Sequence, residues 1–301
     1  MPQKRKSSRP PVPGDAEADA DADILDQLAG DPNLISGIYN YCDRWCERCA
    51  FTARCLSFKM DRATAKRCAE GGGVSGVDAP SFWDDVARSF ALARRLVERE
   101  AEKHGIDLDS ADALVESERE ERKRRRVAAR EGSALYHAAT AYWKSAKALL
   151  ERMRPELDDT AMELQVQARL GAGHPEEVAM SIGDSLEVVQ WYLFFIDVKL
   201  QRAVASRVER AHEGNDGSPS DADGSAKIAL VAIDRTVGAW ASLRGHFSSE
   251  ADAILDLLVQ LERLRRAVER EFPAARAFQR PGFDLLSDIT AKEKTNMSLI
   301  K

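Results

Sequence analysis

The chain has 301 residues, 44% of them hydrophobic, so it is long enough to bury a core in one large domain or two smaller ones. Its 44 basic and 50 acidic residues give a formal net charge of −6, which argues against generic nucleic-acid binding by bulk electrostatic attraction. The five cysteines are an odd number, and neither a secretory signal nor a long apolar run is present. These features predict a protein of the reducing cytoplasm with no membrane span and with thiols available for metal.

The first part of the chain predicts a disordered tail followed by a cysteine-rich segment. Residues 1–30 start with basic residues, continue through prolines and then alternate Asp with Ala, so they offer little apolar surface to offset the entropy of ordering. The cysteine-rich segment spans 31–73 and ends in three glycines. Its apolar spacing predicts a helix that leads into the cysteines and anchors them, through Leu34, Ile35, Ile38 and Tyr41.

Four of the five cysteines, Cys42, Cys46, Cys49 and Cys55, follow the spacing C-x3-C-x2-C-x5-C. On a helix, where each residue turns by about 100°, the first three sulfur atoms would share one narrow face. Thr52 can cap a second helix whose first turn holds Cys55 and whose dipole favours a thiolate there. The spacing therefore predicts a metal site with all four cysteines as ligands.

Two metal centres compete for this site. Closely spaced cysteines with a further one are typical of iron-sulfur clusters, whereas structural zinc more often takes two short cysteine pairs from separated segments. We therefore expect an iron-sulfur cluster of the four-iron four-sulfur type, with zinc as the alternative and redox-active thiols as a third reading. Arg44, Arg48 and Arg54 would offset the negative charge of either centre. The remaining cysteine, Cys68, is expected to be a small residue outside the site, although it could substitute for Cys55.

Two resemblances follow from these cysteines. The first three are similar to the C-x3-C-x2-C signature of radical S-adenosylmethionine enzymes, which carry it on a loop of a βα barrel with an aromatic residue before the last cysteine. Here Arg48 stands at that position and the chain shows no alternation of strands and helices, so the resemblance does not extend to the fold. The full motif resembles the N-terminal cysteine motif of a bacterial protein family, and that resemblance implies no activity.

The rest of the chain predicts an all-α fold, because no stretch alternates with period two and apolar residues recur at helical spacing. We expect an antiparallel multi-helix bundle over 78–278, with a flexible loop at 213–224 and a disordered C-terminal tail at 279–301. The expected helices cover 81–104, 116–126, 133–153, 159–170, 184–213, 225–247 and 249–272.

Three functions are compatible with these patterns. The first is a helical metalloprotein with an iron-sulfur cluster in a redox, sensing or structural role. The second is a zinc-stapled helical protein that binds an unidentified protein partner. The third uses the basic run Arg122 to Arg126 to bind nucleic acid, although this run also reads as an exposed helix whose acids and bases support each other. No nucleophile or acid-base constellation points to catalysis, so an enzymatic role, a substrate and the oligomeric state stay open.

Overall fold

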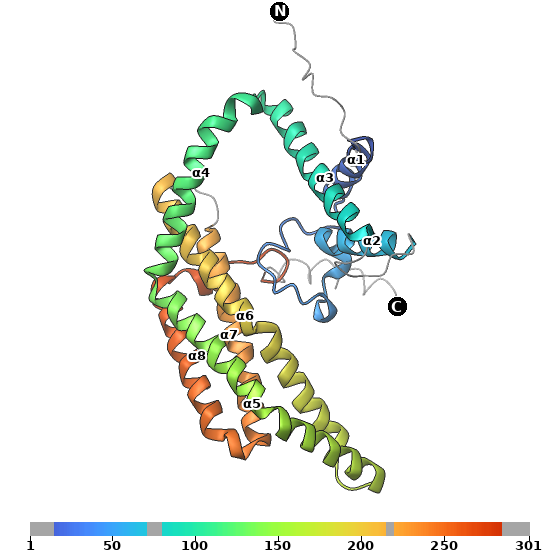
Figure 1. Cartoon of the computed structure of the whole chain (residues 1–301), viewed down its shortest axis with the longest axis vertical. Coiled ribbons are helices and arrows are strands. Elements are labelled where there is room, and N and C mark those ends of the chain that lie inside the picture. Colours follow the sequence, from blue (N-terminus) through green and yellow to red (C-terminus); the bar gives the residue numbers. More distant parts are fainter. Residues whose placement is uncertain (1–14, 71–79, 215–219, 285–301) are drawn as a thin grey trace, which may run out of the picture. The chain divides into compact units, whose positions relative to one another are not determined.

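The computed structural model describes residues 15–70, 80–214 and 220–284 (Figure 1). Within these ranges the regular structure is helical and contains no strand, which confirms the all-α class. The chain divides into two compact units: an N-terminal unit, made of the residues up to 118 except 41–43, and a bundle unit, made of 41–43 and the residues from 119 onward. None of the helices in the described ranges combines the length and the apolarity that crossing a membrane requires.

The N-terminal unit contains more helix than the sequence analysis predicted. Its elements are α1 (Asp15–Ala29), η1 (Cys46–Arg48), η2 (Thr52–Arg54), α2 (Leu56–Glu70), α3 (Pro80–His104) and the start of α4 (Leu108–Glu131). Residues 15–29 were expected to belong to a disordered tail, whereas they form α1 and pack on α3. The expected tails at 1–14 and 285–301, the end of the glycine linker at 71–73, and 215–219 of the loop lie outside the described residues.

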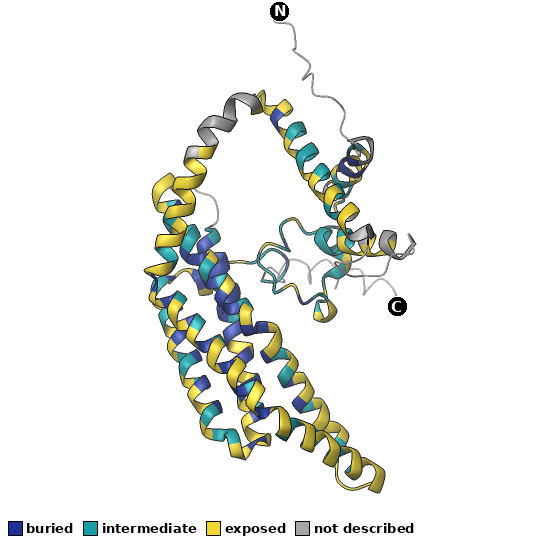
Figure 2. Cartoon of the chain, in the orientation of Figure 1, coloured by how far each residue is buried: buried dark blue, intermediate teal, exposed yellow. Residues whose placement is uncertain are grey.

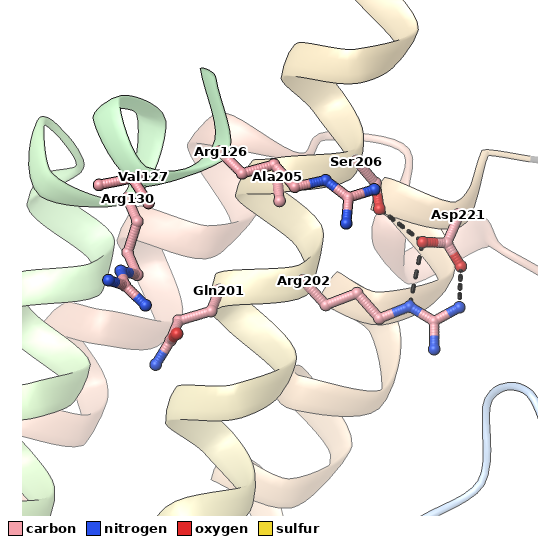
Figure 3. Close-up of a pocket in the computed structure, with 8 residues that line it drawn as sticks. All are labelled: Arg126, Val127, Arg130, Gln201, Arg202, Ala205, Ser206 and Asp221. Atoms are coloured by element: carbon pink, nitrogen blue, oxygen red, sulfur yellow. Dashed lines mark hydrogen bonds and ion pairs between the residues drawn. The ribbon is translucent and has the colours of Figure 1, made fainter. Parts of the chain in front are cut away.

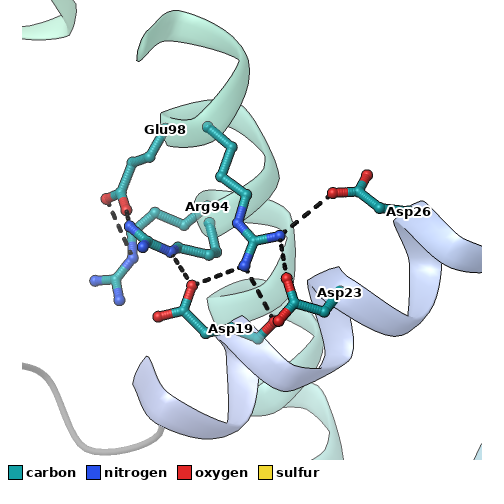
Figure 4. A network of polar contacts seen from close by, with 7 residues as sticks. Asp19, Asp23, Asp26, Arg94 and Glu98 are labelled. Carbon is teal, nitrogen blue, oxygen red and sulfur yellow. Dashed lines mark hydrogen bonds and ion pairs between the residues drawn. The ribbon is translucent and has the colours of Figure 1, made fainter. Parts of the chain in front are cut away.

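Charge pairing explains why the Asp/Ala stretch is helical. Ala18 and Ala22 are buried, and Asp19, Asp23 and Asp26 of α1 point toward α3 (Figure 4). The Arg99 guanidinium lies 2.8 Å from the Asp23 carboxylate and 3.1 Å from that of Asp19. Three further pairs join the two helices, namely Arg88 with Asp21, Arg95 with Asp19, and Arg99 with Asp26. The hydrogen bond from Arg95 lowers the pKa of Asp19, as expected for a carboxylate held by cations.

The cysteine segment is built from turns. Residues 31–45, all of which the structure describes, contain no helix, although a helix was expected to lead into the cysteines. Gly37 has φ +72° and Arg44 has φ +60°, and this left-handed conformation does not continue a right-handed helix. Likewise, Thr52 begins a single 3-10 turn instead of capping an α-helix, and α2 starts only after Cys55. The expectation of a helical site was therefore wrong for Cys42, Cys46 and Cys49.

The bundle unit contains the second half of α4 and four long helices. These helices are α5 (Ala134–Leu170), α6 (Pro175–Glu213), α7 (Asp221–His246) and α8 (Ala251–Glu271), and the short turns η3 (Ser248–Glu250) and η4 (Ala275–Ala277) follow α7 and α8. α6 packs against α5 and α7, and α8 packs against α5 and α7, so the four helices enclose a shared core. Short connections make consecutive helices antiparallel, as Figure 1 shows for α5 and α6.

Two helices of the bundle are longer than predicted. Helix α5 continues through Pro155, where two separate helices were expected, and it ends at Gly171 with φ +63°. Helix α6 starts at Pro175, which suits the first helical position, instead of at Asp184. Ser133 caps the start of α5, since its hydroxyl accepts the N–H of Tyr136 at 3.3 Å.

The core of the bundle unit lies on the facing sides of these helices (Figure 2). Trp240 and Tyr142 are both 0% exposed, and the Trp240 indole N–H donates to the Tyr142 hydroxyl at 3.0 Å. The polar atoms of these two large side chains thus satisfy each other inside an apolar environment. Other fully buried side chains around them are Leu135, Met153, Ile196, Leu200, Ile228, Leu230 and Ile233.

Candidate metal centre

The cysteine segment contains a tandem repeat of one backbone turn. In each copy an aromatic residue, Trp45 or Phe51, precedes a three-residue 3-10 turn that ends in arginine, and a cysteine follows in an extended conformation. The N–H of Cys49 donates to the carbonyl of Cys46 at 3.2 Å, and the N–H of Cys55 donates to that of Thr52 at the same distance. Cys49 and Cys55 therefore occupy equivalent positions of a repeated unit.

The turn geometry gives the cysteines a defined chemical setting. Cys46 opens the first turn and Cys49 follows three residues later, a separation at which side chains of a 3-10 turn lie on the same side. The N–H of Phe51 donates to the Sγ of Cys49 at 3.4 Å, so this sulfur atom accepts a backbone hydrogen bond. Cys42, Cys46, Cys49 and Cys55 are partly exposed and carry thiols instead of disulfides.

Several contacts hold the two turns in the N-terminal unit. The Arg48 guanidinium stacks over the ring of Trp45 at 4.1 Å, and Trp45 is only 5% exposed. The N–H of Ile35 donates to the carbonyl of Arg54 at 3.0 Å. Two further bonds tie the arginines of the segment to its neighbours, from Arg54 Nε to the Asn33 carbonyl and from Arg44 Nη1 to Ser57 Oγ. Arginines expected to act as charge compensation thus also order the backbone around the cysteines.

The predicted ligands are distributed over both units. Cys46, Cys49 and Cys55 belong to the N-terminal unit, whereas Cys42 is grouped with the bundle unit. Across the part of the chain that the structure describes, no three His, Cys, Asp or Glu side chains form a group that could hold a metal ion. Cys68 lies in α2, and its side chain is outside the described set.

Asp43, next to Cys42, is anchored on the bundle unit by three contacts. Its Oδ2 accepts the Tyr192 hydroxyl at 2.7 Å and Nη1 of Arg235 at 2.6 Å. Its carbonyl accepts the indole N–H of Trp191 at 3.0 Å. Burial, followed by the hydrogen bond to Asp43, raises the pKa of Tyr192, so this phenol stays protonated and acts as a donor. The anchor fixes the residue that follows the first predicted ligand.

Tyr41, on the other side of Cys42, forms a second anchor on the bundle unit. Its ring meets that of Phe278 edge to face, with centroids 4.8 Å apart, and its hydroxyl donates to Asp221 at 3.3 Å. The ring lies so close to Gly224 that a Cβ there would be 2.3 Å from Tyr41 Cε1. Glycine at position 224 is therefore required for this packing. Sequence reasoning missed both anchors, because their partners are separated from residues 41–43 by most of the chain.

Three arginines of the basic run on α4 face one buried acidic residue of α6. Glu209 of α6 is 6% exposed, and Arg122 and Arg125 lie 3.1 and 3.6 Å from its carboxylate. Arg126 lies 3.7 Å away from the same group. Arg122 also pairs with Glu213 at 2.6 Å. The run from Arg122 to Arg126 carries five positive charges, and Glu209 and Glu213 of α6 together offset two of them.

No protein family matches the chain, and neither the curated proteins nor the solved structures contain a match to it.

Proposed function

We propose that this helical protein binds an iron-sulfur cluster through the thiolates of Cys42, Cys46, Cys49 and Cys55, in a redox, sensing or structural role. The observation that carries the proposal is the tandem turn, which sets Cys49 and Cys55 at equivalent points of one repeated unit and Cys46 at the start of the first copy. Metal ligation by thiolates is commonly coupled to local folding, so the segment is expected to close around its metal.

The surroundings of the cysteines fit a negatively charged centre. A cluster or zinc ion with four thiolates carries net negative charge, and the arginine that precedes each repeated cysteine, Arg48 or Arg54, supplies positive charge nearby. The N–H of Phe51 already points at the sulfur of Cys49. Hydrogen bonds to sulfur are among the factors that set the potential of a cluster.

Zinc is the second candidate, and one observation favours it. Cys46 and Cys49 enclose a single turn with two residues between them, the short pair that structural zinc sites commonly use. A zinc ion would staple the segment and supply no redox chemistry. The protein would then act through its helical surfaces on a protein partner.

Analysis of anaerobically purified protein for iron, acid-labile sulfide and zinc tests both candidates. Iron with a similar amount of sulfide supports the cluster, and zinc without sulfide supports the staple. The double variant Cys49→Ser/Cys55→Ser should lose the metal, whereas Cys68→Ser, the same change outside the motif, should keep it. Protein that contains neither metal and takes up neither on anaerobic reconstitution would contradict both candidates.

A further inference from the structure

A polar pocket in the bundle unit lies between the second half of α4 and the helices α6 and α7 (Figure 3). Its volume is about 500 Å³, within the range of small-molecule sites. The lining residues are Arg126, Val127, Arg130, Gln201, Arg202, Ala205, Ser206 and Asp221. With three arginines and one aspartate, the lining carries two more positive than negative charges.

One of the arginines is already paired with an acidic residue of the pocket wall. Arg202 donates to both oxygens of Asp221, at 2.5 and 3.1 Å, and the hydroxyl of Ser206 donates to the same carboxylate at 2.6 Å. Burial by itself would raise the pKa of Asp221, but these hydrogen bonds outweigh it and the pKa is lowered. This wall of the pocket is therefore internally neutral and fixed in place.

The other two arginines have donors to spare. Arg126 and Arg130 are four residues apart on α4, so they lie on one face of the helix. Arg126 reaches its acid partner only at 3.7 Å, and its side chain is 54% exposed. The Nε of Arg130 is buried and makes no hydrogen bond within the described structure, while its guanidinium lies over the ring of Tyr136. A buried donor without an acceptor is costly, and a ligand oxygen there would remove that cost.

We propose that this pocket binds a small phosphorylated anion, with Arg126 and Arg130 as the recognition pair. Guanidinium groups bind phosphate oxygens through paired, charge-assisted hydrogen bonds. Two guanidinium groups on successive helical turns can therefore bind a diphosphate together. None of the eight lining residues is aromatic, so the pocket offers no surface for stacking a nucleobase. The pocket thus recognises the phosphate moiety of its ligand. This site is independent of the cysteines.

Calorimetric titration of the full chain with inorganic pyrophosphate tests the proposal. We expect saturable binding that Arg126→Gln/Arg130→Gln weakens by about tenfold or more, because two charged donors are lost. The matched control is Lys123→Gln/Arg124→Gln, which removes the same charge from exposed positions of α4 outside the pocket. It should change the affinity by less than about threefold, as expected for screened surface charges. Circular dichroism shows whether each variant retains its helices.

Two results would overturn the proposal. One is the lack of saturable pyrophosphate binding by the unmodified chain. The other is an equal loss in both double variants, which would assign the binding to general attraction by the basic run. In a second arm, adenosine diphosphate, which carries one diphosphate group, competes with pyrophosphate. Similar affinities support recognition of phosphate alone, and much tighter binding of the nucleotide would contradict it.

Discussion

Substituting Gly224 tests whether Tyr41 packs on α7, because the packing decides whether the free energy of unfolding rises or falls. Replacing a helical glycine with alanine ordinarily stabilises a protein by about 0.5 to 1 kcal/mol. At position 224 the added methyl group would lie 2.3, 2.6 and 2.7 Å from three ring carbons of Tyr41, closer than side chains tolerate. The ring cannot move away without losing its contacts to Phe278 and Asp221. Overpacking of this kind costs about 1 to 3 kcal/mol, so we expect Gly224→Ala to lower the free energy of unfolding by about 1 to 2 kcal/mol.

The same helix provides the control. Gly238 also lies within α7, is exposed, and has nothing within 4 Å of an added Cβ, so Gly238→Ala should stabilise the protein. Urea unfolding followed by far-ultraviolet circular dichroism measures both changes. In a Tyr41→Ala background, Gly224→Ala should lose its penalty, because the two effects share one contact. A stabilising Gly224→Ala, or a penalty that persists without the tyrosine ring, would refute the packing of Tyr41 on α7.

Three further substitutions test the anchor and the core. Asp43→Asn should lower the free energy of unfolding by about 1.5 to 3 kcal/mol, because the buried Tyr192 hydroxyl loses its charged acceptor. A free energy of unfolding, measured in urea, within about 0.5 kcal/mol of that of the unmodified protein would count against the anchor. Tyr142→Phe leaves the buried indole N–H of Trp240 without an acceptor, and we expect a loss of about 1 to 3 kcal/mol, whereas an unchanged urea midpoint would contradict that bond. Burial raises the pKa of Asp197 in the folded state, so its ionisation destabilises the protein as the pH rises through that pKa. Asp197→Asn should therefore be more stable relative to the unmodified chain at pH 7 than at pH 3, and the opposite trend in unfolding free energies would argue against a buried, costly charge.

Long, strongly periodic helices were predictable from the sequence because their burial pattern is local. The predicted helices at 225–247 and 249–272 correspond closely to α7 and α8, whose apolar residues repeat on one face. The end of α3 at His104 was predictable because Gly105, with φ +67°, can take the left-handed conformation that ends a helix, and this effect also acts within a few residues.

The N-terminal helix escaped prediction because its stability depends on a distant partner. Residues 15–29 have little apolar surface by composition. Their aspartates are stabilised in a helix only by ion pairs with the arginines of α3. A signal was nevertheless present in the spacing. Asp19, Asp23 and Asp26 are four and three residues apart, and their partners Arg95 and Arg99 are four apart, so the charges that pair recur at helical intervals.

The geometry of the cysteine segment was missed because a helical template was applied to a segment of turns. The repeat of aromatic residue, two residues, arginine and cysteine, at 45–49 and again at 51–55, is visible in the sequence and would have predicted two similar turns. The docking of Tyr41 and Asp43 had no such signal. Their partners on α6 and α7 can be recognised only after the bundle has formed.

X-ray absorption spectroscopy at the metal edge of anaerobically purified protein tests the central claim most directly. Ligation by the cysteine segment predicts a first shell of sulfur only, at about 2.3 Å for zinc, with iron neighbours as well if a cluster is bound. In Cys46→Ser protein, that sulfur shell should shrink or disappear. A first shell of nitrogen or oxygen, or a sulfur shell that is unchanged in this variant, would contradict metal binding by Cys42, Cys46, Cys49 and Cys55.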